Sequence, residues 1–146
     1  MHAETVRSPQ TSAGQVRILV ADDHEVMRMG IRNLLEAKSN WNICAEASDG
    51  QDAVEKALQC DPDIIIMDIT MPKMNGLEAA RAIAEARPDI PVILFSLHLS
   101  DEMTRSFDNP AIRGAVSKGE AARDLVDAVE TVLQGGMFFA GKKGRK

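Results

Sequence analysis

The feature that most constrains the fold of this chain is a short apolar run followed by a turn and a segment of helical spacing, repeated five times. The third run, Ile64-Ile65-Ile66-Met67, is uninterrupted, as expected for a central strand that is covered on both faces. The runs have the length of strands and are too short for helices. We therefore predict five strands, at 16–21, 43–47, 64–67, 92–95 and 114–117.

The segments after these runs predict five helices, because their apolar residues recur at helical spacing and form one buried stripe. Their expected extents are 24–37, 50–59, about 77–84, 100–107 and 121–134. Asp108-Asn109-Pro110 should end the fourth helix, and Gly135-Gly136 should end the fifth. The helical side chains expected to be buried are Val26, Met27, Ile31, Leu34, Leu35, Ala53, Val54, Ala57, Leu58, Leu77, Ala80, Ile83, Ala84, Leu125, Val126, Val129, Val132 and Leu133.

Five alternations of strand and helix predict the α/β class, with an open, doubly wound, five-stranded parallel sheet and helices on both faces. A closed barrel would need eight such units and a much longer chain than these 146 residues. In open sheets of this kind, ligands bind outside the carboxyl ends of the strands. The candidate functional residues are therefore those that follow the apolar runs.

Composition excludes several classes of protein. The formal net charge of −5 is not the footprint of a nucleic-acid-binding surface, and no apolar run is long enough to cross a membrane. Residues 1–15 have little to bury and lack the apolar core of a secretory signal, so we expect a disordered leader and a cytoplasmic protein. Cys44 and Cys60 are too far apart for a Cys-x-x-Cys motif, and we expect two buried, reduced thiols.

Acidic, hydroxyl and ammonium side chains follow the predicted strands and should meet at one edge of the sheet. Carboxylates brought together repel one another unless a cation lies among them, and hard oxygen ligands suit Mg²⁺. An aspartate can also act as a nucleophile toward a phosphoryl group, with a nearby cation to stabilise the charge. Each residue alone has an ordinary explanation as a turn former, helix cap or surface charge. The candidates are Asp22, Asp23, Asp68, Ser96 and Lys118, while Ser48 and Asp49 receive no role.

The chain resembles the receiver domain of bacterial two-component response regulators over residues 16–136. The resemblance rests on RILVADDHEVMRMGI, DIIIMDITMPKMNGLEA, VILFS and Lys118, and the ADDH, LHLSDE and GG details are most similar to the NarL/LuxR type. It implies a flavodoxin-like sheet with strand order 2-1-3-4-5. It also implies a phosphorylation-dependent signalling domain, not an enzyme, whose partner is a histidine kinase or phosphotransfer protein.

The resemblance also implies roles for single residues. Asp68 would be the phosphoacceptor and would bind Mg²⁺ together with Asp23 and the backbone carbonyl of Thr70. Asp22 would act on the metal indirectly, Ser96 would be the switch hydroxyl, and Lys118 would bind the phosphoryl group. Pro72 and Gly76 would shape the loop beside the acceptor. A homodimer is possible for such a domain, and DNA would be bound only through an output domain that this chain does not include.

Two departures from the family's pattern concern the surface that usually signals. Receivers usually place Tyr or Phe where this chain has Ala115, and the helix before it is interrupted at Asp108-Asn109-Pro110. Residues 137–146 are interpreted as a basic tail or the remnant of a linker, so the chain could be a stand-alone receiver or part of a transcription regulator. The alternative function is a receiver-like interaction module that does not depend on phosphate.

Two enzyme or carrier classes fit less well. Phosphatases resembling the haloacid dehalogenases need a second Asp two residues after the nucleophile, where this chain has Thr70. A flavin or nucleotide carrier would need a Gly-rich phosphate loop after the first strand, where this chain has Asp22 and Asp23.

Overall fold

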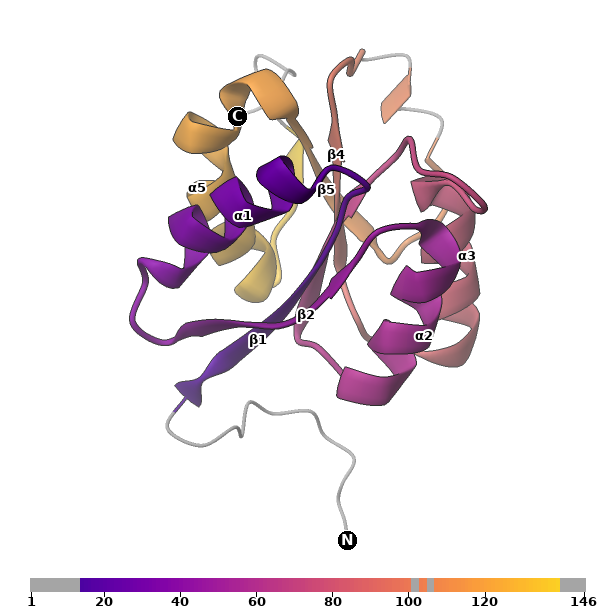
Figure 1. The fold of residues 1–146 in the computed structure, drawn as a ribbon, viewed down its shortest axis with the longest axis horizontal. Helices are drawn as coiled ribbons and strands as arrows, with labels where there is room; N and C mark the ends of the chain where they lie inside the picture. The colour runs from indigo at the N-terminus through magenta and orange to yellow at the C-terminus, as the bar shows by residue number, and fades with distance from the viewer. Residues whose placement is uncertain (1–13, 101–102, 105–106, 140–146) are drawn as a thin grey trace, which may run out of the picture.

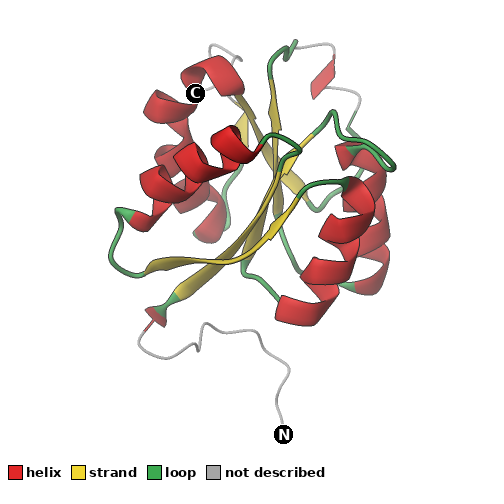
Figure 2. Cartoon of the chain, in the orientation of Figure 1, coloured by secondary structure: helices red, strands yellow, loops and turns green. Residues whose placement is uncertain are grey.

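The chain folds into a parallel sheet that lies between two layers of helices (Figures 1 and 2). The computed structural model describes residues 14–100, 103–104 and 107–139. The predicted leader therefore lies almost entirely outside the described residues, as does the basic part of the predicted tail. The elements, in chain order, are β1 (Val16–Ala21), α1 (Glu25–Glu36), β2 (Trp41–Ala47), α2 (Gly50–Cys60), β3 (Ile64–Asp68), α3 (Gly76–Ala86), β4 (Val92–Ser96), β5 (Ile112–Ser117), the 3-10 turn η3 (Lys118–Glu120), α5 (Ala121–Leu133) and β6 (Phe138–Phe139).

The order of the strands in the sheet is β2-β1-β3-β4-β5-β6, and every pair is parallel. The predicted doubly wound sheet and its order 2-1-3-4-5 are confirmed. Strand order reverses between β1 and β3, which places the carboxyl ends of these two central strands side by side. We call the edge formed by the carboxyl ends of β1, β3, β4 and β5 the carboxyl edge.

The sixth strand corrects the prediction of five strands and of a simple tail after residue 136. Phe138 and Phe139 pair with Gly114 and Ala115 of β5. Gly135 has a φ of 96°, a left-handed conformation that favours glycine and lets the chain turn back after α5. A Cβ atom at Gly114 would lie 2.7 Å from the carbonyl oxygen of Phe138, so β6 can approach β5 because that residue has no side chain.

Each face of the sheet has its own apolar core. Ile18, Ile66 and Phe95 pack on the side of α1 and α5, whereas Leu19, Ile65 and Leu94 pack on the side of α2 and α3. All residues of β3 and β4 are buried, as expected for central strands. Burial of this apolar surface is the main favourable contribution to folding, and it holds the carboxyl edge in place.

Half of the eighteen side chains in the predicted helical stripes are buried and six are partly buried, but three are exposed. Val26 is 81% exposed, Leu58 48% and Leu77 36%, which contradicts their assignment to the core. Successive residues turn by about 100° around a helix, so these side chains lie away from the buried faces set by Ile31 and Leu35 or by their counterparts in α2 and α3. The prediction accepted any apolar residues spaced three to five apart, and this criterion does not distinguish the buried side of a helix from its exposed side.

The predicted helix at 100–107 is only partly within the described residues. Met103 and Thr104 are helical, and Thr104 N donates to the carbonyl of Ser100 at 3.0 Å. Ser100 and Phe107 themselves are not helical, and residues 101–102 and 105–106 lie outside the described residues. The chain is not helical at 108–110, in agreement with the expected stop at Pro110.

Candidate functional site

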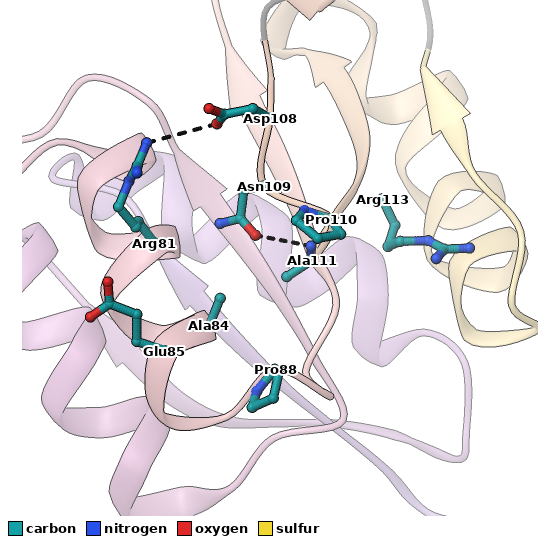
Figure 3. A pocket seen from close by; sticks show the side chains of 9 residues that line it. All are labelled: Arg81, Ala84, Glu85, Pro88, Asp108, Asn109, Pro110, Ala111 and Arg113. Atoms are coloured by element: carbon teal, nitrogen blue, oxygen red, sulfur yellow. Dashed lines mark hydrogen bonds and ion pairs between the residues drawn. The ribbon is translucent and has the colours of Figure 1, made fainter.

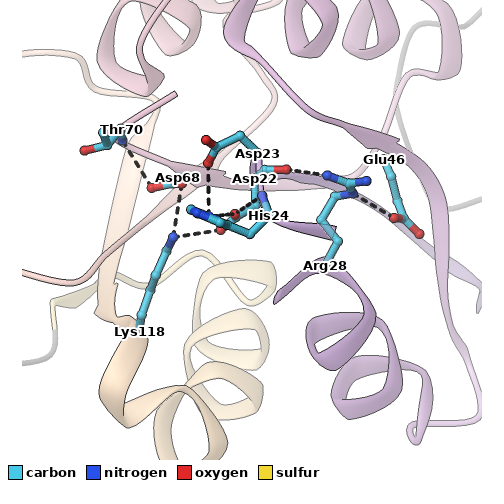
Figure 4. Close-up of polar contacts among 8 residues, drawn as sticks. All are labelled: Asp22, Asp23, His24, Arg28, Glu46, Asp68, Thr70 and Lys118. Atoms are coloured by element: carbon cyan, nitrogen blue, oxygen red, sulfur yellow. Dashed lines mark hydrogen bonds and ion pairs between the residues drawn. The ribbon is translucent and has the colours of Figure 1, made fainter. Parts of the chain in front are cut away.

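The carboxyl edge brings together three aspartates and a lysine from three parts of the chain (Figure 4). Asp22 and Asp23 follow β1, Asp68 ends β3, and Lys118 follows β5. We call these four residues the acid cluster. Asp22 is fully buried and Asp68 is 2% exposed, so two carboxylates lie in the interior of the domain. The structure thus places together four of the five residues predicted from the strand ends, while the fifth, Ser96, bonds to His98.

Lys118 is the cation of the acid cluster. Its side chain is 7% exposed, and its Nζ lies 2.9 Å from Oδ2 of Asp22 and 3.1 Å from Oδ2 of Asp68. Burial alone lowers the pKa of Lys118, but the two carboxylates raise it more, and the net shift is upward. The ammonium group is therefore charged at neutral pH. It also lies 5.7 Å from the centroid of the Phe95 ring, a distance that allows a cation–π contact.

Asp68 is held at both carboxylate oxygens. Oδ1 accepts a hydrogen bond from the backbone N–H of Thr70 at 3.1 Å, and Oδ2 accepts one from Lys118 at 3.1 Å. Burial raises the pKa of Asp68 and the charge of Asp22 raises it further, while Lys118 and the Thr70 N–H lower it, and the net shift is upward. Negative charge on Asp68 is thus only partly compensated by the protein.

The acid cluster fits a divalent cation. Carboxylate oxygens of Asp22, Asp23 and Asp68 and a ring nitrogen of His24 all lie within 4.8 Å of one another. Oδ2 of Asp22 is buried and, apart from its ion pair with Lys118, has no hydrogen-bond partner among the described residues. Hard oxygen ligands with uncompensated charge suit Mg²⁺. The backbone carbonyl of Thr70 stays a predicted ligand.

His24 is a neighbour that sequence reasoning did not assign. Its Nδ1 lies 3.3 Å from Oδ1 of Asp22 and 3.2 Å from Oδ1 of Asp23, and its side chain is 70% exposed. The only signal in the sequence was its position directly after the two aspartates. An exposed imidazole is a poorer ligand for Mg²⁺ than a carboxylate.

The turn between β1 and α1 is fixed by contacts from two neighbouring elements. Arg28 of α1 donates to the backbone carbonyl of Asp22 at 2.6 Å and to the carboxylate of Glu46 in β2 at 3.1 Å. The backbone N–H of His24 donates to Oδ1 of Asp22 at 2.8 Å. These bonds orient the Asp22 carboxylate toward Asp68 and Lys118 (Figure 4).

Two glycines bring the loop after β3 close to its neighbours. A Cβ atom at Gly76 would lie 2.1 Å from the carbonyl oxygen of Asp68, and one at Gly50 would lie 1.9 Å from the carbonyl oxygen of Met74. Asp49 accepts a hydrogen bond from Asp52 N at 2.8 Å as the cap of α2, and its carboxylate lies 3.7 Å from Lys73 in the same loop. The structure therefore gives Asp49, which had no predicted role, a structural one.

Ser96 lies at the carboxyl edge but has other partners than the acid cluster. Its hydroxyl donates to the carbonyl of His98 at 3.1 Å and accepts from the backbone N–H of His98 at 3.2 Å. The residue is 9% exposed and directly follows Phe95, the β4 partner of Asp68. Its expected role as a switch hydroxyl stays a prediction. Ala115, on β5, is fully buried.

A pocket of about 540 Å³ lies away from the acid cluster, near the amino ends of β4 and β5 (Figure 3). It lies between the end of α3 and the turn at Asp108-Asn109-Pro110, where Arg81 and Asp108 form an ion pair of 3.7 Å. The Asn109 side chain accepts a hydrogen bond from Ala111 N at 3.0 Å, which stabilises the turn. The residues that line this pocket include none of the acid cluster.

Among residues 14–100, 103–104 and 107–139, no helix combines the length and the apolar character that a membrane crossing requires.

Comparison with known proteins identifies relatives with the same arrangement of elements. Residues 18–130 match the family described as the response regulator receiver domain. The transcriptional regulatory protein DegU of Brevibacillus brevis is 33% identical over 133 residues, which are 91% of this chain and 56% of that protein. The response regulator UvrY of Escherichia coli K12 is 34% identical over 125 residues, 86% of this chain and 57% of that protein. The chain thus spans about half the length of these relatives.

Solved structures give the same result for the fold. A two-component response regulator of the LuxR family from Aurantimonas sp. SI85-9A1 superposes with a TM-score of 0.80 at 31% identity, covering 85% of this chain and 89% of that one. The signal receiver domain of a NarL response regulator from Mycobacterium tuberculosis superposes with a TM-score of 0.76 at 29% identity, covering 83% and 98%.

Proposed function

Because the chain belongs to the receiver-domain family of two-component response regulators, of the NarL/LuxR type, we propose that Asp68 accepts a phosphoryl group from a phosphohistidine of a partner kinase. The observation that carries the proposal is the nearly complete burial of Asp68 beside Asp22 and the ammonium group of Lys118. A buried carboxylate whose charge is only partly compensated lowers the stability of the fold, and such groups are concentrated at functional sites, where they have a chemical use. Phosphoryl acceptance is such a use.

The transfer requires a nucleophile, a leaving group and a stabilised phosphoryl group. A carboxylate oxygen of Asp68 attacks the phosphorus of the phosphohistidine, so that an O–P bond forms while the P–N bond breaks, and the leaving imidazole takes up a proton. Lys118 stays protonated and follows the new negative charge from Oδ2 of Asp68 to a phosphoryl oxygen. Asp22 keeps the ammonium group near the reacting atoms through its own ion pair.

Asp23, Asp68 and the Thr70 carbonyl would hold Mg²⁺, with Asp22 acting indirectly. The bound ion would neutralise charge on the phosphoryl oxygens and on the carboxylates. Asp23 is the most accessible carboxylate of the acid cluster, with a side chain that is 31% exposed. It is therefore the residue through which an ion from solvent would first make contact.

Further features of the proposal concern the whole protein. Its partner would be a histidine kinase or phosphotransfer protein in the cytoplasm, and the output could involve a homodimer. Any contact with DNA would belong to a separate output domain. Ser96 would be the hydroxyl that responds to the phosphoryl group, by exchanging its bonds to His98 for one to a phosphoryl oxygen.

Labelling with a small phosphodonor tests the proposal. With acetyl phosphate and Mg²⁺, intact-mass spectrometry should show one phosphoryl adduct, and hydroxylamine should remove it as expected for an acyl phosphate. Asp68→Asn should remain unlabelled. Asp127→Asn is the matched control, because Asp127 is an exposed aspartate on α5, and this variant should be labelled like the wild type. Equal labelling of Asp68→Asn would contradict the assignment.

The same assay separates the alternative function. A receiver-like module that does not depend on phosphate is favoured by Ala115, which has no side-chain rotamers with which to signal. Such a module would remain unlabelled, with donor and Mg²⁺ in excess, while its fold stays intact by circular dichroism. Labelling of the wild type at Asp68 would exclude it.

A further inference from the structure

The two cysteines of the chain meet on the side of the sheet that faces α2. Cys44 lies in β2 and Cys60 is the last residue of α2, and their Sγ atoms are 3.0 Å apart. Both are free thiols and both are partly exposed, which corrects the expectation of two buried cysteines. A disulfide has a sulfur–sulfur distance of about 2.05 Å, so an approach of about 1 Å would join them.

An irregularity in β2 places two successive side chains, those of Cys44 and Ala45, on the side of the sheet that faces α2. Ile18 of β1 pairs with Ile43, but the next residue, Leu19, pairs with Ala45, so Cys44 is an extra residue in β2. Ile43 therefore packs on the side of α1 and α5, whereas Ala45 packs on the side of α2 and α3. Side chains alternate along a regular strand, and a bulge changes which face the following residues meet. Cys44 faces Cys60 by the ordinary alternation after Ile43, and the bulge brings Ala45 to the same side.

The surroundings give the two thiols different acidities. The hydrogen bond from the Cys44 thiol lowers the pKa of Cys60 to about 7, with help from the positive charge of Arg17 and against burial and the charge of Asp61. The same hydrogen bond and burial raise the pKa of Cys44 well above its usual range. Cys60 is therefore the thiol of the pair that ionises first, while Cys44 remains a thiol. The thiolate is the reactive form of cysteine.

Arg17 also fixes the position of Cys60. Its guanidinium donates to the backbone carbonyl of Cys60 at 2.5 Å, and its backbone N–H donates to Asp63 at 2.9 Å. The end of α2 is thereby held against β1, the strand next to β2. The two sulfur atoms are thus held in proximity by the fold and not only by their own contact.

We propose that Cys44 and Cys60 form a reversible dithiol–disulfide site that hydroperoxides oxidise, with Cys60 as the nucleophile and Cys44 as the resolving thiol. The Cys60 thiolate attacks one oxygen of hydrogen peroxide, an S–O bond forms while the O–O bond breaks, and the hydroxide that leaves takes up a proton to become water. The Cys44 sulfur then attacks the Cys60 sulfur, an S–S bond forms while the S–O bond breaks, and the hydroxyl leaves as water with the Cys44 proton.

The bond would close a loop that contains the whole of α2. This loop includes Asp49 and Gly50, which contact Lys73 and Met74 in the loop beside the phosphoacceptor. Oxidation would therefore secure the edge strand β2 to α2 without involving the acid cluster. Since a closed loop lowers the entropy of the unfolded chain, we expect the melting temperature to rise by roughly 10 °C.

Peptide mapping under non-reducing conditions tests the site. After treatment of the full chain with hydrogen peroxide, a peptide pair joined through Cys44 and Cys60 should appear in the monomer, and dithiothreitol should separate it. Cys44→Ser should accumulate a sulfenic acid at Cys60 that dimedone traps. Cys60→Ser should give at least tenfold less sulfenic acid at Cys44. Disulfides only between two chains, or equal trapping in the two variants, would overturn the proposal.

The pH dependence of alkylation gives a second test that does not require the disulfide. Iodoacetamide should modify Cys60 with a half-maximal rate near pH 7, because the rate follows the thiolate fraction as pH rises. Cys44→Ala removes the hydrogen-bond donor and should move this midpoint toward higher pH, while Cys44→Ser keeps a donor and should move it less. Circular dichroism shows whether each variant is folded. A midpoint at the ordinary pKa of cysteine in the folded wild type would overturn the assignment of Cys60 as nucleophile.

Discussion

The acid cluster and the loop that follows β4 lie at the same edge of the sheet, but they are held very differently. Within the cluster, Lys118 contacts Asp22 and Asp68 at 2.9 and 3.1 Å, and Arg28 holds the backbone of Asp22. In the loop 96–100, the Ser96 hydroxyl bonds to the backbone of His98, and Leu97 is 67% exposed. The side chains of the acid cluster are thus held in fixed positions, whereas a rearrangement of the loop would cost less free energy.

This comparison suggests that the acid cluster carries out phosphorylation and that the loop after β4 carries the conformational response. A phosphoryl group on Asp68 would contact the charged side chains of the acid cluster, which are fixed. It would also contact the Ser96 hydroxyl, which can exchange its hydrogen bonds. A ligand shifts a conformational equilibrium only through contacts that differ between the two states. Ser96 offers such a contact, because its present hydrogen bonds are made to its own loop. Variants of the two regions should therefore have separable effects on phosphorylation and on response.

Replacing Lys118 should have the largest effect. Lys118→Met leaves Asp22 and Asp68 buried without their cation, and we expect a loss of about 3 kcal/mol in the free energy of unfolding. Labelling of Asp68 by acetyl phosphate should fall by about a hundredfold. Urea melts and labelling kinetics measure the two effects, and added Mg²⁺ should restore part of the stability. Wild-type labelling by a folded Lys118→Met protein would show that the cluster does not need this cation.

An aromatic residue at position 115 should have the second-largest effect. Ala115 is fully buried in the core on the side of α2 and α3, beside Phe139 of β6, so Ala115→Tyr overpacks this core and should destabilise the fold by about 2 kcal/mol. Because the cluster lies elsewhere, the rate of labelling of the folded fraction should stay within about twofold of the wild type. Ala122→Tyr, on an exposed position of α5, is the control. A stable Ala115→Tyr protein would mean that β6 gives way to an aromatic side chain.

Removing one negative charge from the acid cluster should increase stability in the absence of metal. Asp23→Asn relieves repulsion with Asp22 and Asp68, and we expect a gain of about 1 kcal/mol in urea melts without Mg²⁺. The same change should abolish labelling that depends on Mg²⁺, because it removes a proposed ligand. His24→Gln is the control, because it changes the imidazole ring next to Asp23 without removing a proposed metal ligand. Phosphorylation of Asp23→Asn at the wild-type rate would contradict the metal role of Asp23.

The smallest effect on stability should come from Ser96. Ser96→Ala loses only the two bonds to His98 and should change the free energy of unfolding by about 0.5 kcal/mol, with labelling of Asp68 largely intact. In wild-type protein, beryllofluoride should shift the backbone amide resonances of residues 96–107 strongly, and the variant should reduce these shifts. Two-dimensional NMR of both proteins decides this. A full wild-type pattern in Ser96→Ala would place the switch in another element.

The doubly wound architecture and the members of the acid cluster could be predicted from the sequence, for the same physical reason. Alternation of apolar runs with helical segments leaves few arrangements other than a doubly wound parallel sheet. In that sheet the residues that follow the strands must meet at one edge, so Asp22, Asp23, Asp68, Ser96 and Lys118 could be grouped before any distance was available. Their proximity depends on topology and not on details of packing.

Features that depend on a single residue's geometry could not be predicted. The two-residue strand β6 has no periodicity of its own, and it forms because Gly114 and Gly135 allow the approach and the turn. The bulge at Cys44 changes the face that the residues after it meet, and no periodicity in the sequence predicts it. The Ser96 hydroxyl was expected near the phosphoacceptor, but hydrogen bonding within a loop decides its present direction.

The close approach of Gly50 and Gly76 to neighbouring backbone has a consequence for how this sequence can vary. Neither glycine carries a functional group, yet a single added carbon would overlap with the carbonyl oxygen of Met74 or of Asp68. In a saturation library selected for phosphoryl acceptance, these two positions should tolerate as few amino acids as Asp68 itself. A map of tolerated substitutions would therefore mark residues that shape the site as clearly as those that perform its chemistry.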